Sequence, residues 1–464
     1  MTLSLYNTLS GRIEEFKPVR EGQVGVYVCG LTVYDDMHIG HARTYLAFDV
    51  ILRYLKYSGY NVTYVQNVTD VDDKIIKRAR EREVDPLQLS REYALRSRED
   101  QKALNLLEAD VYPTVSSHIA DIIAAVEKLI ASGHAYVADG SVYFDVSTAL
   151  DYGKLSRQDT EHLSRHRIEP NSNKRNPLDF SLWKKSGKGE LGFDSPWGFG
   201  RPGWHIECSV MSAKYLGGRF DIHGGALDLV FPHHENEIAQ SEALSGEQPF
   251  VKYWLHTGFL NSSGEKMSKS LGNILPVREF LKSHSAQSFR AFILQTHYRS
   301  PVDYREGGID AAGKSVARLG IFRRNLSGIA ARAHAEGGSM AKDLAQRLSE
   351  DFTLAMDDDF NTPRAFAAVF DFVRGAKGLK LGNESQSSLA SALGMFDSVT
   401  GVLGLGLSGS SAALTVEERK LVEERDRYRA EKNWVESDHI RDELARRGIK
   451  LVDTANGTQA AWTG

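Results

Sequence analysis

The sequence predicts an α/β protein that begins with a doubly wound, Rossmann-type parallel sheet carrying an insertion. An all-helical bundle and a small mixed α/β C-terminal domain are expected to follow. A β-rich run at 24–28, an amphipathic helix at about 38–57 and a second strand at 61–67 give the strand–helix–strand order of a parallel sheet. The pattern from about 305 to 400 is wholly helical. Residues 401–413 are rich in Gly, Ser and Ala, which is typical of a linker.

The first predicted helix carries apolar residues at three- and four-residue spacing, which places them on one face. They are Tyr45, Phe48, Leu52 and Leu55. Gly59 is expected to end this helix, because glycine favours the position just after a helix. After the second strand, Thr69 or Asp70 is expected to cap the next helix.

Residues from about 115 to 200 are expected to form the insertion. Apolar spacing predicts a helix over about 119–129 that ends at Gly133, and two short strands at 135–137 and 142–144. The stretch 154–188 is basic and irregular, which predicts a loop. A solvated loop and a contact for RNA phosphates are both open interpretations of this stretch.

Cap residues indicate where the later helices begin. Thr362 is expected to cap a helix with Pro363 at its first position, and Thr415 to Glu418 form a capping box for a final charged helix. Gly404 to Gly409 have the glycine spacing of a dinucleotide-binding loop. No convincing strand precedes them and no helix opens at their end, so we interpret them as linker.

These patterns give the expected domain boundaries. The doubly wound domain is expected in two halves, 1–115 and 201–250, separated by the connective insertion 116–200. The expected segments after it are 251–305, a helical bundle at 306–402, a linker at 403–414 and a small C-terminal domain at 415–464.

Composition narrows the class of protein. The chain has 464 residues, a formal net charge of −4 and two cysteines, Cys29 and Cys208. It has no apolar run long enough to span a membrane and its first residues do not have the form of a signal peptide, so a cytoplasmic protein is expected. Because the net charge is slightly negative, binding to a nucleic acid would need local basic surface. A disulfide is disfavoured in the cytoplasm, which leaves metal binding or simple burial for the cysteines.

Two short segments have the chemistry to bind a nucleotide. His38-Ile39-Gly40-His41 begins the helix after the first strand, where a helix N-terminus attracts phosphate, imidazoles can donate to its oxygens and Gly40 leaves room for an adenine ring. Lys266-Met267-Ser268-Lys269-Ser270 lies on a glycine-flanked loop, and its lysines can neutralise a leaving pyrophosphate. Each alone is weak, since capping histidines or a mobile basic loop would look the same. Together, and in this order, they resemble the two ATP motifs of class I aminoacyl-tRNA synthetases.

The cysteines also have potential partners for a metal. His233 and Glu237 are four residues apart near a predicted helix start, so they share a helix face. Two thiolates, one imidazole and one carboxylate make a plausible zinc set with Cys29 and Cys208, although His234 competes with His233. Two buried structural cysteines and a polar helix are the alternative.

Longer segments resemble the cysteinyl-tRNA synthetase family through essentially the whole chain. They are Tyr27 to Asp35, Asn67 to Lys74, Arg201 to Ser209, Phe231 to Glu237 and the region from Trp434 to Asp442. The resemblance implies one Zn²⁺ per chain, held by Cys29, Cys208, His233 and Glu237, that binds the substrate thiol, and Mg²⁺ with ATP. It also implies L-cysteine, ATP and the cysteine tRNA as partners of a monomeric enzyme.

The same resemblance implies roles for further residues. The residues that would bind ATP are His38, Gly40, His41, Lys266 and Lys269. The two histidines and the two lysines among them would also act in catalysis. Thr69 and Trp204 would line the amino-acid pocket, with a helix cap and a core aromatic as alternatives. Asp228 could reach the ATP ribose or the amino group. The candidate tRNA contacts of the last domain are Lys420, Arg425, Arg427, Arg429, Arg441 and Arg446, each of which could equally be a solvated side chain.

Two rival functions remain at this stage. A ligase that joins cysteine to a small amine would resemble the catalytic part but would lack the full C-terminal tail, which this chain has in residues 415–464. A non-catalytic RNA-binding paralogue would be expected to lose the histidines or lysines of the ATP motifs, which this chain keeps.

Overall fold

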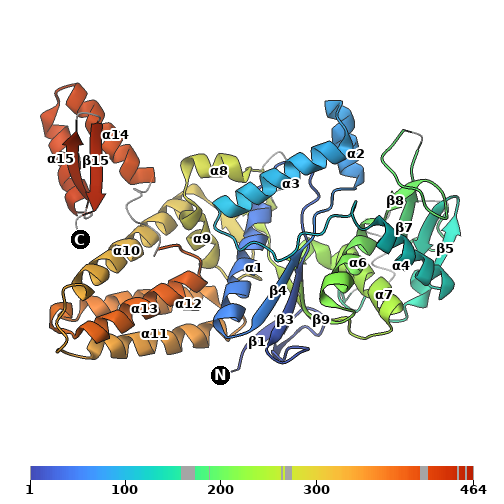
Figure 1. Cartoon of the computed structure of the whole chain (residues 1–464), viewed down its shortest axis with the longest axis horizontal. Helices are drawn as coiled ribbons and strands as arrows, with labels where there is room; N and C mark the ends of the chain where they lie inside the picture. The colour runs from blue at the N-terminus through green and yellow to red at the C-terminus, as the bar shows by residue number, and fades with distance from the viewer. Residues whose placement is uncertain are drawn as a thin grey trace. The chain divides into compact units, whose positions relative to one another are not determined.

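The computed structural model describes residues 2–157, 173–187, 189–262, 265–266, 274–407, 416–446, 449–454 and 457–462. The chain divides into two compact units (Figure 1). The N-terminal unit comprises residues 2–259 and 299–301, and the C-terminal unit comprises residues 260–298 and 302 onward.

A four-stranded parallel sheet forms the centre of the N-terminal unit. Its order is β10 (Val251–Thr257), β9 (Phe220–Ala226), β3 (Gln23–Val28) and β4 (Asn61–Gln66). This arrangement confirms the predicted doubly wound sheet. The expected end of the doubly wound domain at residue 250 is wrong, however, because β10 pairs with β9 as the edge strand of this sheet.

Helices cover both faces of the sheet. Helix α1 (Ile39–Tyr57) connects β3 to β4, while α6 (Trp204–Leu216) and α7 (Glu235–Ser245) precede and follow β9 and lie on the other side (Figure 1). The two connections run toward opposite edges of the sheet, from β3 to β4 and from β9 to β10. Because both crossovers are right-handed, their helices must lie on opposite faces. The predicted stripe of α1 is buried, but so are Leu46, Val50 and Ile51 around it, so the helix is more enclosed than its periodicity indicates.

The cap predicted for the next helix is wrong. Helix α2 (Asp73–Arg82) is capped by Asp72, whose side chain accepts from the Lys74 backbone N–H. Thr69 instead forms a parallel bridge with Thr32, and the Asp70 carboxylate accepts hydrogen bonds from Ser116. Helix α3 (Pro86–Ala103) follows, capped by Asp85. These long-range pairings extend the strand-like conformation beyond β4 and delay the start of the helix.

The insertion is a small antiparallel sheet preceded by a helix. Helix α4 (Ile119–Ala131) is followed by β5 (Ala135–Ala138), β6 (Ser141–Phe144), β7 (Phe180–Lys185) and β8 (Gly200–Pro202), paired in that order. The stretch 154–188 was predicted as an irregular loop, and β7 contradicts this in part. Its residues Phe180, Leu182 and Trp183 are buried in the core, and this burial outweighs the polar sequence around them. Residues 158–172 and 188 lie outside the described residues.

A second antiparallel pair, β1 (Ser4–Asn7) and β2 (Arg12–Glu15), completes the N-terminal unit. In the C-terminal unit, β11 (Leu260–Ser262) lies between β12 (Glu265–Lys266) and β13 (Val302–Tyr304). The helices that follow are α8 (Val277–Ser283), α9 (Ala286–Leu294), α10 (Glu306–Ala330), α11 (Met340–Met356), α12 (Thr362–Lys377) and α13 (Gln386–Val402). They confirm the predicted helical region.

Two details of the helical region concern the cap of α12 and a glycine after α13. Helix α12 is capped by Asn361, one residue before the expected Thr362. After α13, Gly404 has φ +66°, and a Cβ there would lie 2.4 Å from the buried Arg290 guanidinium. The positive φ and the close approach of Arg290 therefore explain this glycine.

The C-terminal segment forms two helices and a hairpin. They are α14 (Val416–Ala430), α15 (Trp434–Arg446), β14 (Ile449–Thr454) and β15 (Gly457–Trp462), around a core of Val422, Ile440, Leu444 and Ile449. The expected cap Thr415 lies outside the described residues. Among the residues that were described, no helix has the length and apolarity needed to cross a membrane.

Candidate metal centre and substrate pocket

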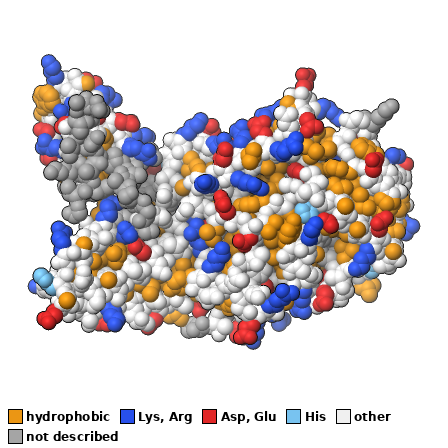
Figure 2. Space-filling model, in the orientation of Figure 1, with side chains coloured by type: hydrophobic (Ala, Val, Ile, Leu, Met, Phe, Trp, Pro, Cys, Tyr) orange, Lys and Arg blue, Asp and Glu red, His pale blue; other side chains and the backbone are white. Residues whose placement is uncertain are grey.

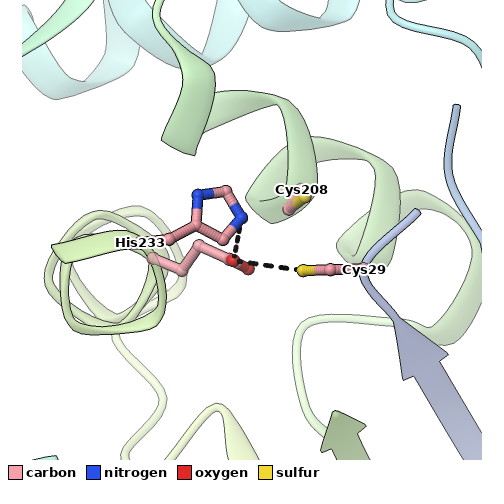
Figure 3. Close-up of side chains that lie close together, drawn as sticks. Cys29, Cys208 and His233 are labelled. Carbon is pink, nitrogen blue, oxygen red and sulfur yellow. Dashed lines mark hydrogen bonds and ion pairs between the residues drawn. The ribbon is translucent and has the colours of Figure 1, made fainter. Parts of the chain in front are cut away.

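The four predicted metal ligands come together in the N-terminal unit. Cys29 directly follows β3 and Cys208 lies in α6. His233 lies in η3 (Val230–His234), and Glu237 lies in the first turn of α7. Their ligand atoms lie within 4.8 Å of one another, and all four side chains are buried. Figure 3 shows Cys29, Cys208 and His233 converging on one point from separate elements.

The topology of the sheet explains why these residues meet. Strands β3 and β9 are neighbours, and their chains leave the sheet toward opposite faces, which opens a crevice at their carboxyl ends. Cys29 is held at this edge because its backbone N–H donates to the Gly224 carbonyl at 3.1 Å. His233 and Glu237 are one helical turn apart, and His233 Nε2 lies 2.9 Å from Glu237 Oε1.

The electrostatics of the cluster favour a cation. The Cys29 thiol donates to Cys208 and lowers the Cys208 pKa to about 6, while burial and Cys208 raise the Cys29 pKa. Burial opposes protonation of His233, but the Glu237 charge and hydrogen bonds raise the pKa of His233 to about 10. Burial also opposes ionisation of Glu237, yet the imidazoles of His223 and His233 lower its pKa to about 2. At neutral pH a thiolate and a carboxylate therefore face a protonated His233, and a metal ion could take the place of that positive charge.

A second set of possible ligands overlaps with the first. Cys29, His223, His234 and Glu237 also lie within 4.8 Å of one another. His234 Nε2 lies 3.3 Å from Cys29 Sγ, and its Nδ1 lies 2.7 Å from His256 Nε2. The set that includes both thiols suits zinc better, because zinc favours thiolate ligands.

Sequence reasoning missed the buried histidines around the cluster. His223 Nε2 contacts Glu237 Oε2 at 2.9 Å, and His205 Nδ1 contacts His233 Nδ1 at 2.9 Å. His256 on β10 contacts His234 as described above. The available signal was a histidine in each of two largely apolar strands, β9 and β10, because a buried polar residue needs a partner.

The two residues expected to line the amino-acid pocket lie next to the cluster. Trp204 begins α6 and stacks on His233, with ring centroids 4.3 Å apart and an interplanar angle of 29°. It is 37% exposed, which contradicts the alternative of a core aromatic. Thr69 is buried; its hydroxyl donates to Glu207 Oε2 at 3.4 Å and accepts from Asn67 Nδ2 at 3.2 Å. Since Asp72 caps α2, the alternative role of Thr69 as a helix cap is also excluded.

The first predicted ATP motif lies at the start of α1, where the sequence places it. His38 is the cap of the helix: its Nδ1 accepts from the His41 backbone N–H, which leaves the proton on Nε2. The two rings stack with centroids 3.6 Å apart. A Cβ at Gly40 would lie 2.9 Å from His38 Nδ1, so glycine is needed for the histidine to fold over the helix start.

The remaining predicted ATP residues are only partly visible. Asp228 lies half-buried in η2 (Leu227–Leu229), just before η3, which contains His233. Lys266 lies in β12, where its backbone pairs with Asn261. The Lys266 side chain and Lys269 lie outside the described residues.

Comparisons with known proteins define the class. Residues 15–314 match the family described as tRNA synthetases class I (C) catalytic domain, and residues 351–408 match the DALR domain. The fold is similar to Mycobacterium tuberculosis methionyl-tRNA synthetase in complex with methionyl-adenylate, with a TM-score of 0.62 and 17% identity over 82% of this chain and 90% of that one. The sheet and the histidine motif therefore belong to a class I aminoacyl-tRNA synthetase.

Full-length relatives specify the family. The cysteine–tRNA ligase of Thermococcus onnurineus is 49% identical, over 99% of this chain and 98% of its own length. That of Heliobacterium modesticaldum is 46% identical, over 99% of both chains. The chain belongs to the cysteine–tRNA ligase family, and its reaction is the ATP-dependent ligation of cysteine to tRNA. This confirms the resemblance seen in the sequence.

Proposed function

We propose that Cys29, Cys208, His233 and Glu237 hold one Zn²⁺ and that the sulfur of the substrate cysteine binds to this ion. The observation that supports this is the convergence of two buried thiols, an imidazole and a carboxylate within 4.8 Å. When bound, zinc would act as a Lewis acid that favours a thiolate over the hydroxyl of serine. Each tenfold preference for cysteine requires only about 1.4 kcal/mol.

Room for the substrate at the ion needs an explanation, because four protein ligands ordinarily close a zinc site. The substrate sulfur must then be a fifth ligand, or one protein ligand must loosen. Glu237 is a carboxylate ligand whose second oxygen already has a partner: while Oε1 faces His233, its Oε2 lies 2.9 Å from His223 Nε2. A Glu237 carboxylate that leaves the ion would therefore remain paired.

Thr69 and Trp204 are proposed to orient the rest of the amino acid. The Thr69 hydroxyl gives its proton to Glu207 and accepts from Asn67, so one lone pair remains to accept from the substrate ammonium group. Trp204 is stacked on His233 and would form the wall beside the substrate side chain. Thr69 would thus contact the ammonium group of the substrate, and Trp204, from a different element, would contact its side chain.

The adenylation site is proposed to use both ATP motifs. His38, Gly40 and His41 would bind ATP at the start of α1, Asp228 would contact the ribose or the amino group, and Lys266 and Lys269 would neutralise the pyrophosphate that leaves with Mg²⁺. The cysteine carboxylate attacks the α-phosphate of ATP and displaces pyrophosphate, which gives the adenylate. A ribose hydroxyl at the tRNA 3′ end then attacks the acyl carbon of the adenylate, forms the ester and releases AMP. Neither step needs a protein nucleophile, so catalysis rests on positioning and on stabilisation of charge.

The helical and C-terminal domains are proposed to bind the tRNA in a monomeric, cytoplasmic enzyme. Figure 2 shows basic and acidic side chains interspersed over the face in view, so contacts made by this face would be local. Arg425 and Arg429 are poor candidates, because both pair with Asp453 inside the small C-terminal domain, and Arg425 is buried. Lys420, Arg427, Arg441 and Arg446 stay as candidate contacts.

Cysteine-dependent exchange of pyrophosphate into ATP tests the zinc proposal. We expect exchange with cysteine to fall sharply when zinc is removed by a chelator and to return when zinc, but not Mg²⁺, is restored. Serine, run in parallel, should support little exchange with either form. Equal exchange with serine and cysteine, or full exchange in the zinc-free protein, would contradict the proposal.

A further inference from the structure

Tyr27 carries a buried hydroxyl that its packing does not explain. It lies in β3, two residues before Cys29, and its side chain is completely inaccessible to solvent. In the described part of the chain, the hydroxyl has no nitrogen or oxygen partner within hydrogen-bond distance. Buried tyrosine hydroxyls ordinarily find a partner, because leaving one unpaired is costly.

The ring of Tyr27 is well packed without the hydroxyl. It contacts the His223 ring at 5.0 Å between centroids and the Phe220 ring at 6.5 Å, and it belongs to the same core cluster as Cys29 and Cys208. A phenylalanine would make these ring contacts equally well. The hydroxyl therefore requires a reason other than filling the core.

The groups that act on this hydroxyl are those of the metal centre. Cys208 lies within side-chain hydrogen-bonding reach of the hydroxyl. The Tyr27 ring contacts His223, whose Nε2 lies 2.9 Å from Glu237 Oε2. A phenol carries a proton that it can donate, and a cysteine bound to a metal is a thiolate, which is a strong acceptor.

We propose that Tyr27 is a positioning residue of the metal centre, whose hydroxyl donates a hydrogen bond to the Cys208 sulfur when that sulfur is a metal-bound thiolate. This inference rests on the proposed zinc site. A donor to a metal-bound sulfur fixes the ligand in place and draws charge from it, which leaves the ion a better acceptor for the substrate sulfur. Losing such an outer partner typically costs 10- to 100-fold in metal affinity or activity.

The substitution Tyr27→Phe tests this proposal in the full chain, with Tyr93→Phe as the matched control. Tyr93 is also buried, but it lies on α3 in a separate core cluster. We expect Tyr27→Phe to lower zinc affinity about tenfold in competition with a chromogenic chelator. It should also shift the thiolate-to-metal absorption band of the cobalt-substituted protein. Tyr93→Phe should change neither.

Thermal unfolding of the zinc-free proteins separates this role from a general packing role. Removing an unpaired hydroxyl should leave zinc-free Tyr27→Phe at least as stable as the zinc-free parent, whereas a hydroxyl that supports the core would make the variant less stable. Unchanged zinc affinity and an unchanged cobalt spectrum in Tyr27→Phe would overturn the proposal.

A crystal structure of the zinc-loaded parent chain gives a test that does not depend on the variant. We expect the Tyr27 hydroxyl within hydrogen-bond distance of Cys208 Sγ. A hydroxyl bonded to a buried water instead would overturn the proposal. A parent chain that binds no zinc would defeat the zinc site itself, while a parent that binds zinc as tightly as Tyr27→Phe would defeat only the role of Tyr27.

Discussion

His256 makes the stability of the N-terminal unit depend on pH. It is buried on β10, where Nδ1 lies 2.8 Å from Thr8 Oγ1 and Nε2 lies 2.7 Å from His234 Nδ1. Burial, and secondly the neighbouring His223, lower the pKa of His256 to about 3. The imidazole is therefore neutral in the fold at pH values where the unfolded chain is protonated.

The sign and size of the effect follow from this difference in pKa. The unfolded histidine has a pKa of about 6.5, so the unfolded chain gains a proton as the pH falls below that value while the folded chain does not until about pH 3. His256 therefore costs no stability above about pH 7 and destabilises the fold progressively below pH 6.5. At pH 5 the difference of about 1.5 units, at about 1.4 kcal/mol each, amounts to about 2 kcal/mol.

The test compares urea unfolding of the zinc-loaded parent and His256→Gln at pH 7.5 and pH 5.0, followed by tryptophan fluorescence. Glutamine stays neutral over this range, so the variant should lose about 2 kcal/mol less than the parent on acidification. Effects of acid on the metal ligands and on the other histidines are common to both proteins. An equal loss of stability in the two proteins would refute the reasoning.

Two further predictions concern packing and an ion pair. Gly224→Ala places a Cβ 2.0 Å from Phe48 Cζ, so urea unfolding should show a loss of about 1–3 kcal/mol; unchanged stability would mean that the ring moves aside freely. Asp453 has a pKa held below its usual range by Arg425 and Arg429, so its contribution is present above about pH 4 and is lost as the pH falls. Hydrogen exchange in residues 416–446 should therefore accelerate between pH 5 and pH 3 more in the parent than in Asp453→Asn, after correction for the intrinsic rate. The same acceleration in both proteins would contradict this.

The sequence predicted the first strands and helix of the sheet from local patterns, and it predicted the metal ligands from the longer family motifs. The apolar patterns of β3, α1 and β4 predicted these elements correctly. The patterns are clear because the three segments are consecutive in the chain and pack against one another. Cys29 and Cys208 could be assigned to one site with His233 and Glu237 because the family resemblance supplies the alignment that spacing alone lacks.

The sequence did not reveal features that depend on distant partners. The roles of His223 and His256 arise because separate strands bring them beside Glu237 and His234. The cap of α2 shifted to Asp72 because Thr69 pairs with a distant loop. The sequence indicated Arg425 as a candidate nucleic-acid contact, but its side chain pairs with Asp453, which lies in the later strand β14.

X-ray absorption at the zinc edge tests the central claim most directly, because it counts the sulfur atoms around the ion. For the zinc-loaded chain, the proposed ligand set predicts two sulfur neighbours at about 2.3 Å. Adding cysteine should raise this to three, and adding serine should leave it at two. A sulfur count that does not change with saturating cysteine would show that the substrate thiol binds elsewhere and would contradict the account.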